Sequence, residues 1–378
     1  MERKEVVILG VGMTKFGRAT GRDLFGMAQE AGLKALKDAG VSFRDIQIGF
    51  CAHVNQPTGT GQECFARLGM TGIPVTNVEV ACASHTRGVM MAADMISAGA
   101  YDMALVIGVE KMPRGMVPMK GDRRDTPYAL MTGIMPMPGI YSLQAQRHMH
   151  DYGTKPEHFG KIAEKNHRNG SLNPNATYRE VFTLEQIMSS RMIADPITML
   201  MCSANADGAT ATVVCSKEKA KRYTTRPMLM VGWAGGTPMY VKGESAGGMA
   251  EGPTAYLGKK VYEMSGIGPK EVKVAQMHDA FTPGELFTTE ELGLCAHGKG
   301  GPFVWEGNTE IGGKIPINTD GGLTSCGHPI GATGGRMIAE LCWQLRGKAG
   351  ERQVPGNPQV ALLHNQGLGG TNVMMFKM

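Results

Sequence analysis

Cys82 lies where an expected strand passes into an expected helix, a position that can activate a thiol. The segment from Asn77 to Gly88 leads into a helix predicted from Val89 to Ala98. A helix N-terminus carries partial positive charge and free N–H groups, which lower the pKa of a thiol and favour the thiolate. Taken alone, however, this cysteine is explained more simply as an ordinary buried residue.

A second helix entrance contains a possible base for such a nucleophile. The glycine-rich residues 321–334 include His328, set between a glycine and a proline, before a helix predicted for residues 335–345. Aligning the two helices places His328 at the position that matches Cys82. If the two parts of the chain are related by a pseudo-twofold axis, both helix N-termini meet and their side chains form a Cys–His pair for nucleophilic catalysis.

The helices and strands on either side of these two helix N-termini form a pattern that occurs twice along the chain. The interval from Gly40 to Ile48 equals that from Gly266 to Val274. Alternating strands and helices favour mostly parallel sheets joined by right-handed crossovers, here two sheets with a shared layer of helices. Each copy has a strand, an amphipathic helix, a closing glycine and further strands: 6–10, 24–36, Gly40, 41–48 and 103–108 in the first, and 228–232, 256–264, Gly266, 267–274 and 360–365 in the second.

This repeat predicts an α/β protein of two duplicated βαβαβ-type halves. The first half covers residues 1–112 and the second covers residues 226–378. Residues 113–225 form an insertion that contains proline- and methionine-rich turns and two predicted helices, 142–152 and 156–169, and returns to the first half near its end. An insertion of this size is more typical of a substrate-covering lobe than of a linker.

Composition narrows the possible partners. The formal net charge is +5 over 378 residues, which suits an anionic small molecule and is far from the basic stripe of a nucleic-acid-binding protein. The eight cysteines include no C-x-x-C pair, so the sequence predicts free thiols and a cytoplasmic location, without a bound metal. The run Val6–Leu9 is too short for a signal peptide, and no stretch approaches the ~20 apolar residues that cross a membrane.

Four segments in order give the chain a specific resemblance. The Cys82 segment, the run 327–334 (GHPIGATG), the run 364–370 (HNQGLGG) and the pair of segments 191–196 and 203–211 resemble the signature blocks of thiolases. The similarity covers nearly the whole chain and is closest to the sterol-carrier-protein type. It implies the thiolase fold, in which the duplicated halves pack in five layers. It also implies an acyltransferase that takes coenzyme A as a substrate and holds no permanent cofactor.

The resemblance also implies roles for individual residues. Cys82 attacks a carbonyl and becomes acylated, and His328 activates it. His328 and His278 help to bind one oxyanion, and the backbone near Cys82 and Gly367 binds the other. Preorganised donors of this kind contribute about 3 kcal/mol each to lowering a barrier. His364 and Asn365, in the block that ends at the glycine loop, are also expected to line the oxyanion or substrate-binding site.

The chain departs from the family at the second catalytic cysteine. Thiolases use that thiol as acid and base at the substrate α-carbon, but the two usual positions here hold Asn365 and Ala280. Cys326 is the nearest replacement in the sequence. His85, which stands where the family has a small glycine, is either a second proton carrier or the wall of a pocket.

Three functions therefore compete. The leading prediction is an acyl-CoA thiolase that cleaves a 3-oxoacyl-CoA or runs the reverse condensation, in fatty acid or aromatic degradation. A retro-aldolase on the same scaffold and a non-catalytic acyl-CoA-binding subunit are the alternatives. The resemblance further predicts a homodimer, a small OB-fold and zinc-ribbon partner subunit, and benzoylsuccinyl-CoA as one specific substrate, with neither nucleic acid nor membrane as a partner.

Overall fold

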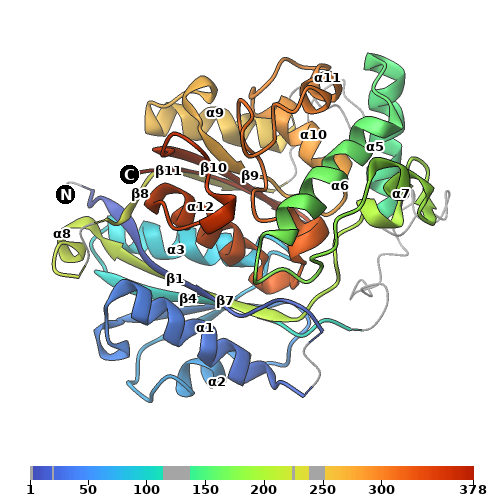
Figure 1. Ribbon diagram of the computed structural model, residues 1–378. Coiled ribbons are helices and arrows are strands. Elements are labelled where there is room, and N and C mark those ends of the chain that lie inside the picture. Colours follow the sequence, from blue (N-terminus) through green and yellow to red (C-terminus); the bar gives the residue numbers. More distant parts are fainter. Residues whose placement is uncertain (1–2, 19–20, 114–136, 224–225, 238–251) are drawn as a thin grey trace.

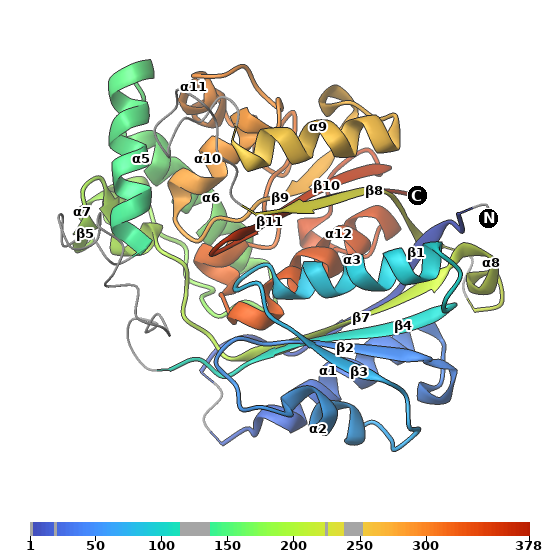
Figure 2. The ribbon, with the colours of Figure 1, turned by 180° about the vertical axis from the view of Figure 1, so that it is seen from behind.

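The computed structural model describes residues 3–18, 21–113, 137–223, 226–237 and 252–378. Helices and strands alternate in five layers, with α1 and α2 outside one part of the sheet, α3 and α12 in the middle, and α9 outside the other part (Figures 1 and 2). Three clusters of buried side chains fill the interfaces between these layers, and one of them covers both sides of the central layer. The central layer therefore packs against both halves.

The first half consists of a sheet with α1 on its outer face and α3 on its inner face (Figure 1). Its elements are β1 (Val6–Met13), α1 (Leu24–Ala39), β2 (Ile48–Ala52), α2 (Thr60–Ala66), β3 (Val75–Val78), α3 (Ser84–Ser97) and β4 (Met103–Glu110), joined later by β7 (Gly208–Ser216) and α8 (Lys217–Ala220).

The second half repeats this order with a longer middle section. Its elements are β8 (Met228–Gly236), α9 (Pro253–Ser265), β9 (Val274–Gln276), α10 (Thr282–Glu291), α11 (Gly300–Trp305), α12 (Thr333–Arg346), β10 (Val360–Gly367) and β11 (Gly370–Lys377).

Between the two halves in the sequence comes a helical lobe, which lies at one side of the layers and packs against α10 and α11 (Figure 2). It contains α5 (Met137–Tyr152), α6 (Pro156–Ser171), α7 (Leu184–Ser189), β5 (Met192–Ala194) and β6 (Ile197–Thr198), and includes both helices that the sequence predicted. Residues 114–136 and 224–225 of the predicted insertion 113–225 lie outside the described part of the chain, and the predicted domain boundaries stay a prediction.

The sheet corrects one expectation about strand direction. Its nine strands follow the order β3-β2-β4-β7-β1-β8-β11-β10-β9. The strands of the first half and those of the second half therefore form one continuous sheet, joined by the short β1–β8 pair. Of the strand pairs in the described part of this sheet, β2–β3, β2–β4 and β9–β10 are parallel and the other five are antiparallel, so the prediction of mostly parallel sheets is wrong. The reason is that β7 and β11 enter antiparallel to their neighbours, β7 after the lobe and β11 directly after β10.

The duplication is visible in matching helix ends. Gly40 and Gly266 follow α1 and α9 in the left-handed conformation, with φ of 69° and 66°, a conformation that a side chain would strain. After each glycine comes a single 3-10 turn capped by an acidic residue: Asp45 accepts from the Ser42 N–H, and Glu271 accepts from the Gly268 N–H. The repeat seen in the sequence is therefore a structural repeat.

Helices α3 and α12 touch at their N-terminal ends. A Cβ atom added to Gly334, in the first turn of α12, would lie 2.7 Å from Thr86 Cγ2 and 2.9 Å from Thr86 N. Real Cβ atoms do not come that close, so this approach requires glycine. The contact places the residues just before both helices next to each other.

Candidate active site

The nucleophile candidate sits on a strained turn. Ala81, the residue before Cys82, has φ of 46°, a value that a residue with a side chain rarely adopts. Ser84 Oγ holds the turn by accepting from the Val80 N–H and donating to the Ala81 carbonyl oxygen. This local network places the Cys82 side chain ahead of helix α3 rather than within it.

The structure brings Cys82 and His328 into contact. Cys82 Sγ lies 3.1 Å from His328 Nε2. The two residues are not at equivalent positions in the sequence. Cys82 lies two positions before the start of α3, whereas His328 lies five positions before the start of α12 and is separated from that helix by the 3-10 turn Ile330–Ala332. The matching of their sequence positions was therefore approximate, although the two side chains do meet.

Thr333 sets the orientation and the tautomer of His328. Thr333 Oγ1 donates its hydrogen to the Pro329 carbonyl oxygen at 2.9 Å, so it can only accept from His328 Nδ1, 2.7 Å away. A neutral imidazole with hydrogen on Nδ1 has a lone pair on Nε2. That lone pair faces the Cys82 thiol, which is the arrangement a general base needs.

The pKa values of Cys82 and His328 indicate that both side chains are neutral before the reaction. Burial raises the pKa of the Cys82 thiol to about 12, and the negative charges of Glu110 and Glu79 act in the same direction. Burial lowers the pKa of His328 to about 3, and Arg336 acts in the same direction. The backbone N–H of Cys82 does lower the thiol pKa, as expected for a helix entrance, but the loss of hydration outweighs it. His328 is the neighbouring group placed to accept the thiol proton.

His278 completes the group. Its ring lies 5.5 Å from that of His328, centroid to centroid, in an edge-to-face arrangement. Among the described residues, a donor atom from each of Cys82, His278 and His328 lies within 4.8 Å of the others. Zinc accepts such donors. In this structure, however, the Nε2 atom of His328 faces a thiol and the Nδ1 atom of His278 faces the amide of Asn365, which are contacts for moving and holding protons.

The glycine loop closes over the nucleophile turn. A Cβ at Gly367 would lie 2.2 Å from the Val80 carbonyl oxygen and 2.9 Å from Cys82 N, so only glycine permits this approach. The loop therefore brings Gly367 beside the backbone N–H of Cys82, where the second oxyanion site is expected.

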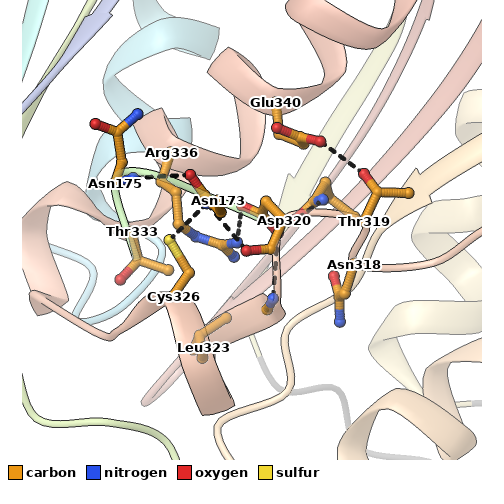
Figure 3. A network of polar contacts seen from close by, with 12 residues as sticks. Asn173, Asn175, Asn318, Thr319, Asp320, Leu323, Cys326, Thr333, Arg336 and Glu340 are labelled. Carbon is orange, nitrogen blue, oxygen red and sulfur yellow. Dashed lines mark hydrogen bonds and ion pairs between the residues drawn. The ribbon is translucent and has the colours of Figure 1, made fainter. Parts of the chain in front are cut away.

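Cys326 is far less suited to proton transfer than the sequence suggested. Its side chain is fully buried in an apolar cluster with Met13 and Phe16, and its sulfur accepts from Asn173 Nδ2 at 3.4 Å (Figure 3). Burial raises its pKa, and the nearby Asp320 adds to that effect. The acid–base role for Cys326 stays a prediction that this geometry does not support.

The side chains of His85 and His364 form hydrogen bonds with threonines outside the Cys82–His328 pair. The nitrogens of the fully buried His85 lie 3.0 Å from Thr212 Oγ1 and 3.3 Å from Thr210 Oγ1. His364 contacts Thr254 Oγ1 of α9 at 3.1 Å. Because alternate residues of a strand face opposite sides, His364 points toward α9 whereas Asn365 points toward α3. The two threonine contacts favour a structural wall for His85.

Two residues near the site escaped the sequence reasoning. Thr333 could have been found from its place in the GHPIGATG run, five residues after the histidine. Tyr141 of α5 gave no signal, because it comes from the lobe. Burial raises the pKa of its hydroxyl. A Cβ atom added to Gly284 would lie 3.0 Å from the Tyr141 ring and 3.1 Å from the His278 carbonyl oxygen, so this ring lies next to the His278 segment.

Comparison with known proteins identifies the family. The profile described as "Thiolase, N-terminal domain" matches residues 6–218, and the one described as "Thiolase C-terminal domain-like" matches residues 245–376. Sterol carrier protein 2 of Oryctolagus cuniculus is 39% identical over 393 residues, covering 99% of this chain and 72% of that protein. Benzoylsuccinyl-CoA thiolase subunit BbsB of Thauera aromatica is 36% identical over 385 residues, covering 98% of this chain and 96% of that one.

The solved structures agree with this result. The structure of the "Ltp2-ChsH2(DUF35) aldolase" has a TM-score of 0.87 and 29% identity, covering 99% of this chain and 98% of that one. The chain belongs to the thiolase family. It is an acyltransferase of the sterol-carrier-protein type, with an α/β thiolase fold and acyl-CoA chemistry.

Proposed function

We propose that this enzyme cleaves a 3-oxoacyl-CoA with coenzyme A, or runs the reverse condensation, through an acyl-enzyme on Cys82. The contact between Cys82 Sγ and His328 Nε2 carries the proposal, because it places a neutral thiol 3.1 Å from a free lone pair. In the first step Cys82 attacks the 3-oxo carbonyl while its proton passes to His328. In the second, coenzyme A attacks the acyl-enzyme and releases Cys82.

The oxyanions that form in these steps need hydrogen-bond donors. His278, which is neutral because burial and the neighbouring His328 lower its pKa well below the usual value, supplies one donor. The backbone at Cys82 and Gly367 supplies the other site. Losing one preorganised donor typically costs about 3 kcal/mol in the barrier.

A small partner subunit is part of the proposal. BbsB is a subunit of a benzoylsuccinyl-CoA thiolase, and Ltp2 is named together with ChsH2(DUF35) in its structure. We accordingly propose an OB-fold and zinc-ribbon partner, benzoylsuccinyl-CoA as one substrate to test, a role in fatty acid or aromatic degradation, and a cytoplasmic location.

We also propose a homodimer built on the edge strand β3. This strand ends the sheet, and its residues Thr76 and Asn77 are exposed. An exposed strand edge presents unpaired N–H and C=O groups that a second copy can pair with.

A retro-aldolase is the second candidate, because the similar Ltp2-ChsH2(DUF35) structure is named as an aldolase. The two reactions differ at Cys82, since aldol cleavage needs no acyl-enzyme. Intact mass spectrometry after mixing with a panel of 3-oxoacyl-CoA thioesters, with and without a small OB-fold partner protein, separates them. We expect an acyl adduct in the native enzyme that is absent in Cys82→Ala. Turnover without any adduct, and with Cys82→Ala still active, would contradict the thiolase proposal.

A further inference from the structure

The Nδ1 atom of His278 faces an amide rather than a carboxylate or a hydroxyl. Asn365 Nδ2 lies 3.2 Å from it. The other end of the same amide, Asn365 Oδ1, lies 3.0 Å from Thr86 Oγ1. The Ala83 carbonyl oxygen, 2.9 Å from the same hydroxyl, accepts a hydrogen from Asn372 Nδ2 at 3.1 Å, which leaves the single Thr86 hydrogen for Asn365 Oδ1. Asn372 Nδ2 in turn donates to Thr86 Oγ1 at 2.8 Å. All five residues are buried, so no surrounding water competes for these bonds.

This chain of bonds decides where the His278 hydrogen lies. An amide nitrogen can only donate, so His278 Nδ1 must accept. A neutral imidazole has one hydrogen, which is then on Nε2. The result is the opposite of His328, whose Nδ1 donates to Thr333 and whose Nε2 is a bare acceptor. The two adjacent histidines therefore hold opposite tautomers.

We propose that Asn365 is a positioning residue that keeps His278 in the Nε2–H tautomer, so that His278 donates to the substrate oxygen and His328 alone of the two moves the proton. This inference rests on the proposed function, and it addresses the position where the second catalytic cysteine of the family would stand. An asparagine there cannot titrate. It instead fixes which of the two histidines is the donor and which is the base.

The proton balance follows from this assignment. The Cys82 S–H bond breaks as the sulfur bonds to C3 of the 3-oxoacyl-CoA, and His328 Nε2 takes the proton. The C2–C3 bond then breaks, and its electron pair goes to C2 of the departing acyl-CoA. His328 gives the same proton to C2 and returns to the neutral state. His278 keeps its hydrogen throughout, because giving it up would leave an unfavourable imidazolate.

The tautomer can be measured directly in the native protein. In spectra of the ¹⁵N-histidine-labelled enzyme, protonated and bare imidazole nitrogens have well-separated shifts, and the His278 signals are assigned by their loss in His278→Gln. We expect His278 to carry its hydrogen on Nε2 and His328 on Nδ1. Hydrogen on His278 Nδ1 would overturn the inference, whether or not the enzyme acylates Cys82. Absence of an acyl-enzyme with the expected tautomers would instead count against the proposed function.

Replacing the amide with a carboxylate inverts the polarity at His278. In Asn365→Asp the side chain accepts from Nδ1–H, so Nε2 loses its hydrogen. We expect kcat for acylation to fall about 10²-fold or more, the cost of losing one oxyanion donor, with little change in KM. Asn169→Asp is the matched control, since Asn169 is a buried asparagine that donates to the Asn318 carbonyl oxygen and touches neither histidine. Equal rates for Asn365→Asp and native enzyme would contradict the positioning role.

Exchange of the acetyl-CoA α-protons with deuterated solvent tests the proton carrier. We expect His328→Ala to abolish exchange and Tyr141→Phe to retain it, because the Tyr141 ring lies next to the His278 segment but its hydroxyl is not required. Loss of exchange in Tyr141→Phe, or its survival in His328→Ala, would show that another group carries the proton.

Thr333→Val frees His328 Nδ1 without changing the shape of the side chain. It should slow exchange while leaving the His278 tautomer in place.

Discussion

The segments that lead into α3 and α12 occupy corresponding places in the two halves, yet they differ in length and polarity. The first is short: β3 ends at Val78 and α3 begins at Ser84. The second follows α10, α11 and a fully buried turn that contains Asp320, which pairs with Arg336 of α12 (Figure 3). The duplication supplied two adjacent helix entrances, and they differ in that one presents Cys82 on a tight turn and the other presents His328 beside buried polar groups.

The first test removes the base while keeping the nucleophile turn. In His328→Ala, Cys82 keeps its high pKa but loses its proton acceptor, so kcat should fall by about 10²- to 10⁴-fold. Steady-state turnover of the 3-oxoacyl-CoA and the acylation burst measure the loss. His167→Ala is the control, because His167 is a buried histidine of α6 whose Nε2 donates to the Leu200 carbonyl oxygen. Near-native acylation in His328→Ala would remove the Cys–His pair from the mechanism.

The second test concerns the buried polar support of the α12 entrance. Arg336 and Asp320 are each about 1% exposed as side chains, so Arg336→Met leaves a carboxylate buried without its partner. Breaking such a pair costs roughly 3–5 kcal/mol of stability. Urea or thermal denaturation measures this change. Arg67→Met, which breaks a half-exposed pair with Glu63, should leave the midpoint almost unchanged. If Arg336→Met and Arg67→Met unfolded at the same midpoint, the buried Arg336–Asp320 pair would not stabilise the turn before α12.

The third test uses pH to separate a neutral pair from an ion pair at the nucleophile turn. Because the Cys82 pKa is about 12, its thiolate fraction rises as pH rises and does not saturate near neutrality. Iodoacetamide labelling of Cys82 should therefore accelerate about tenfold per pH unit between about pH 6 and pH 9. Peptide mass spectrometry follows the rate, and bound acyl-CoA should protect the residue. A constant rate across this range would show that His328 holds the thiol proton beforehand or takes it during alkylation, and that the free thiolate is not the reacting form.

The smallest effect is expected from the two residues that the sequence offered as replacements for the second cysteine. Cys326→Ser and His85→Gln both lie in buried structural contacts, so each should keep the acylation burst and α-proton exchange close to native. Steady-state rates and deuterium incorporation are compared with the native enzyme after a matched thermal melt. If either variant lost α-proton exchange but kept the acylation burst, the replaced residue would be the proton carrier after all.

The sequence predicted the frame of the site better than its chemistry. The helix ends at Gly40 and Gly266, both lobe helices and the terminal strands of each half were readable from local patterns. Strand direction was not, because β7 and β11 gain their partners only through distant pairings. Cys326 illustrates the same limit: two positions before His328 in sequence, its sulfur nevertheless faces Asn173 and an apolar cluster.

By itself, the sequence determined the repeat and the family and predicted Cys82 and His328 as the nucleophile and base, since glycine positions, apolar periodicity and reactive side chains are local properties. The tertiary structure decided their protonation. The pKa of Cys82 depends on how much water packing removes, and packing raised the value that the helix entrance was expected to lower. The tautomers of His278 and His328 depend on Asn365 and Thr333, whose roles follow from which atoms folding brings within hydrogen-bond distance.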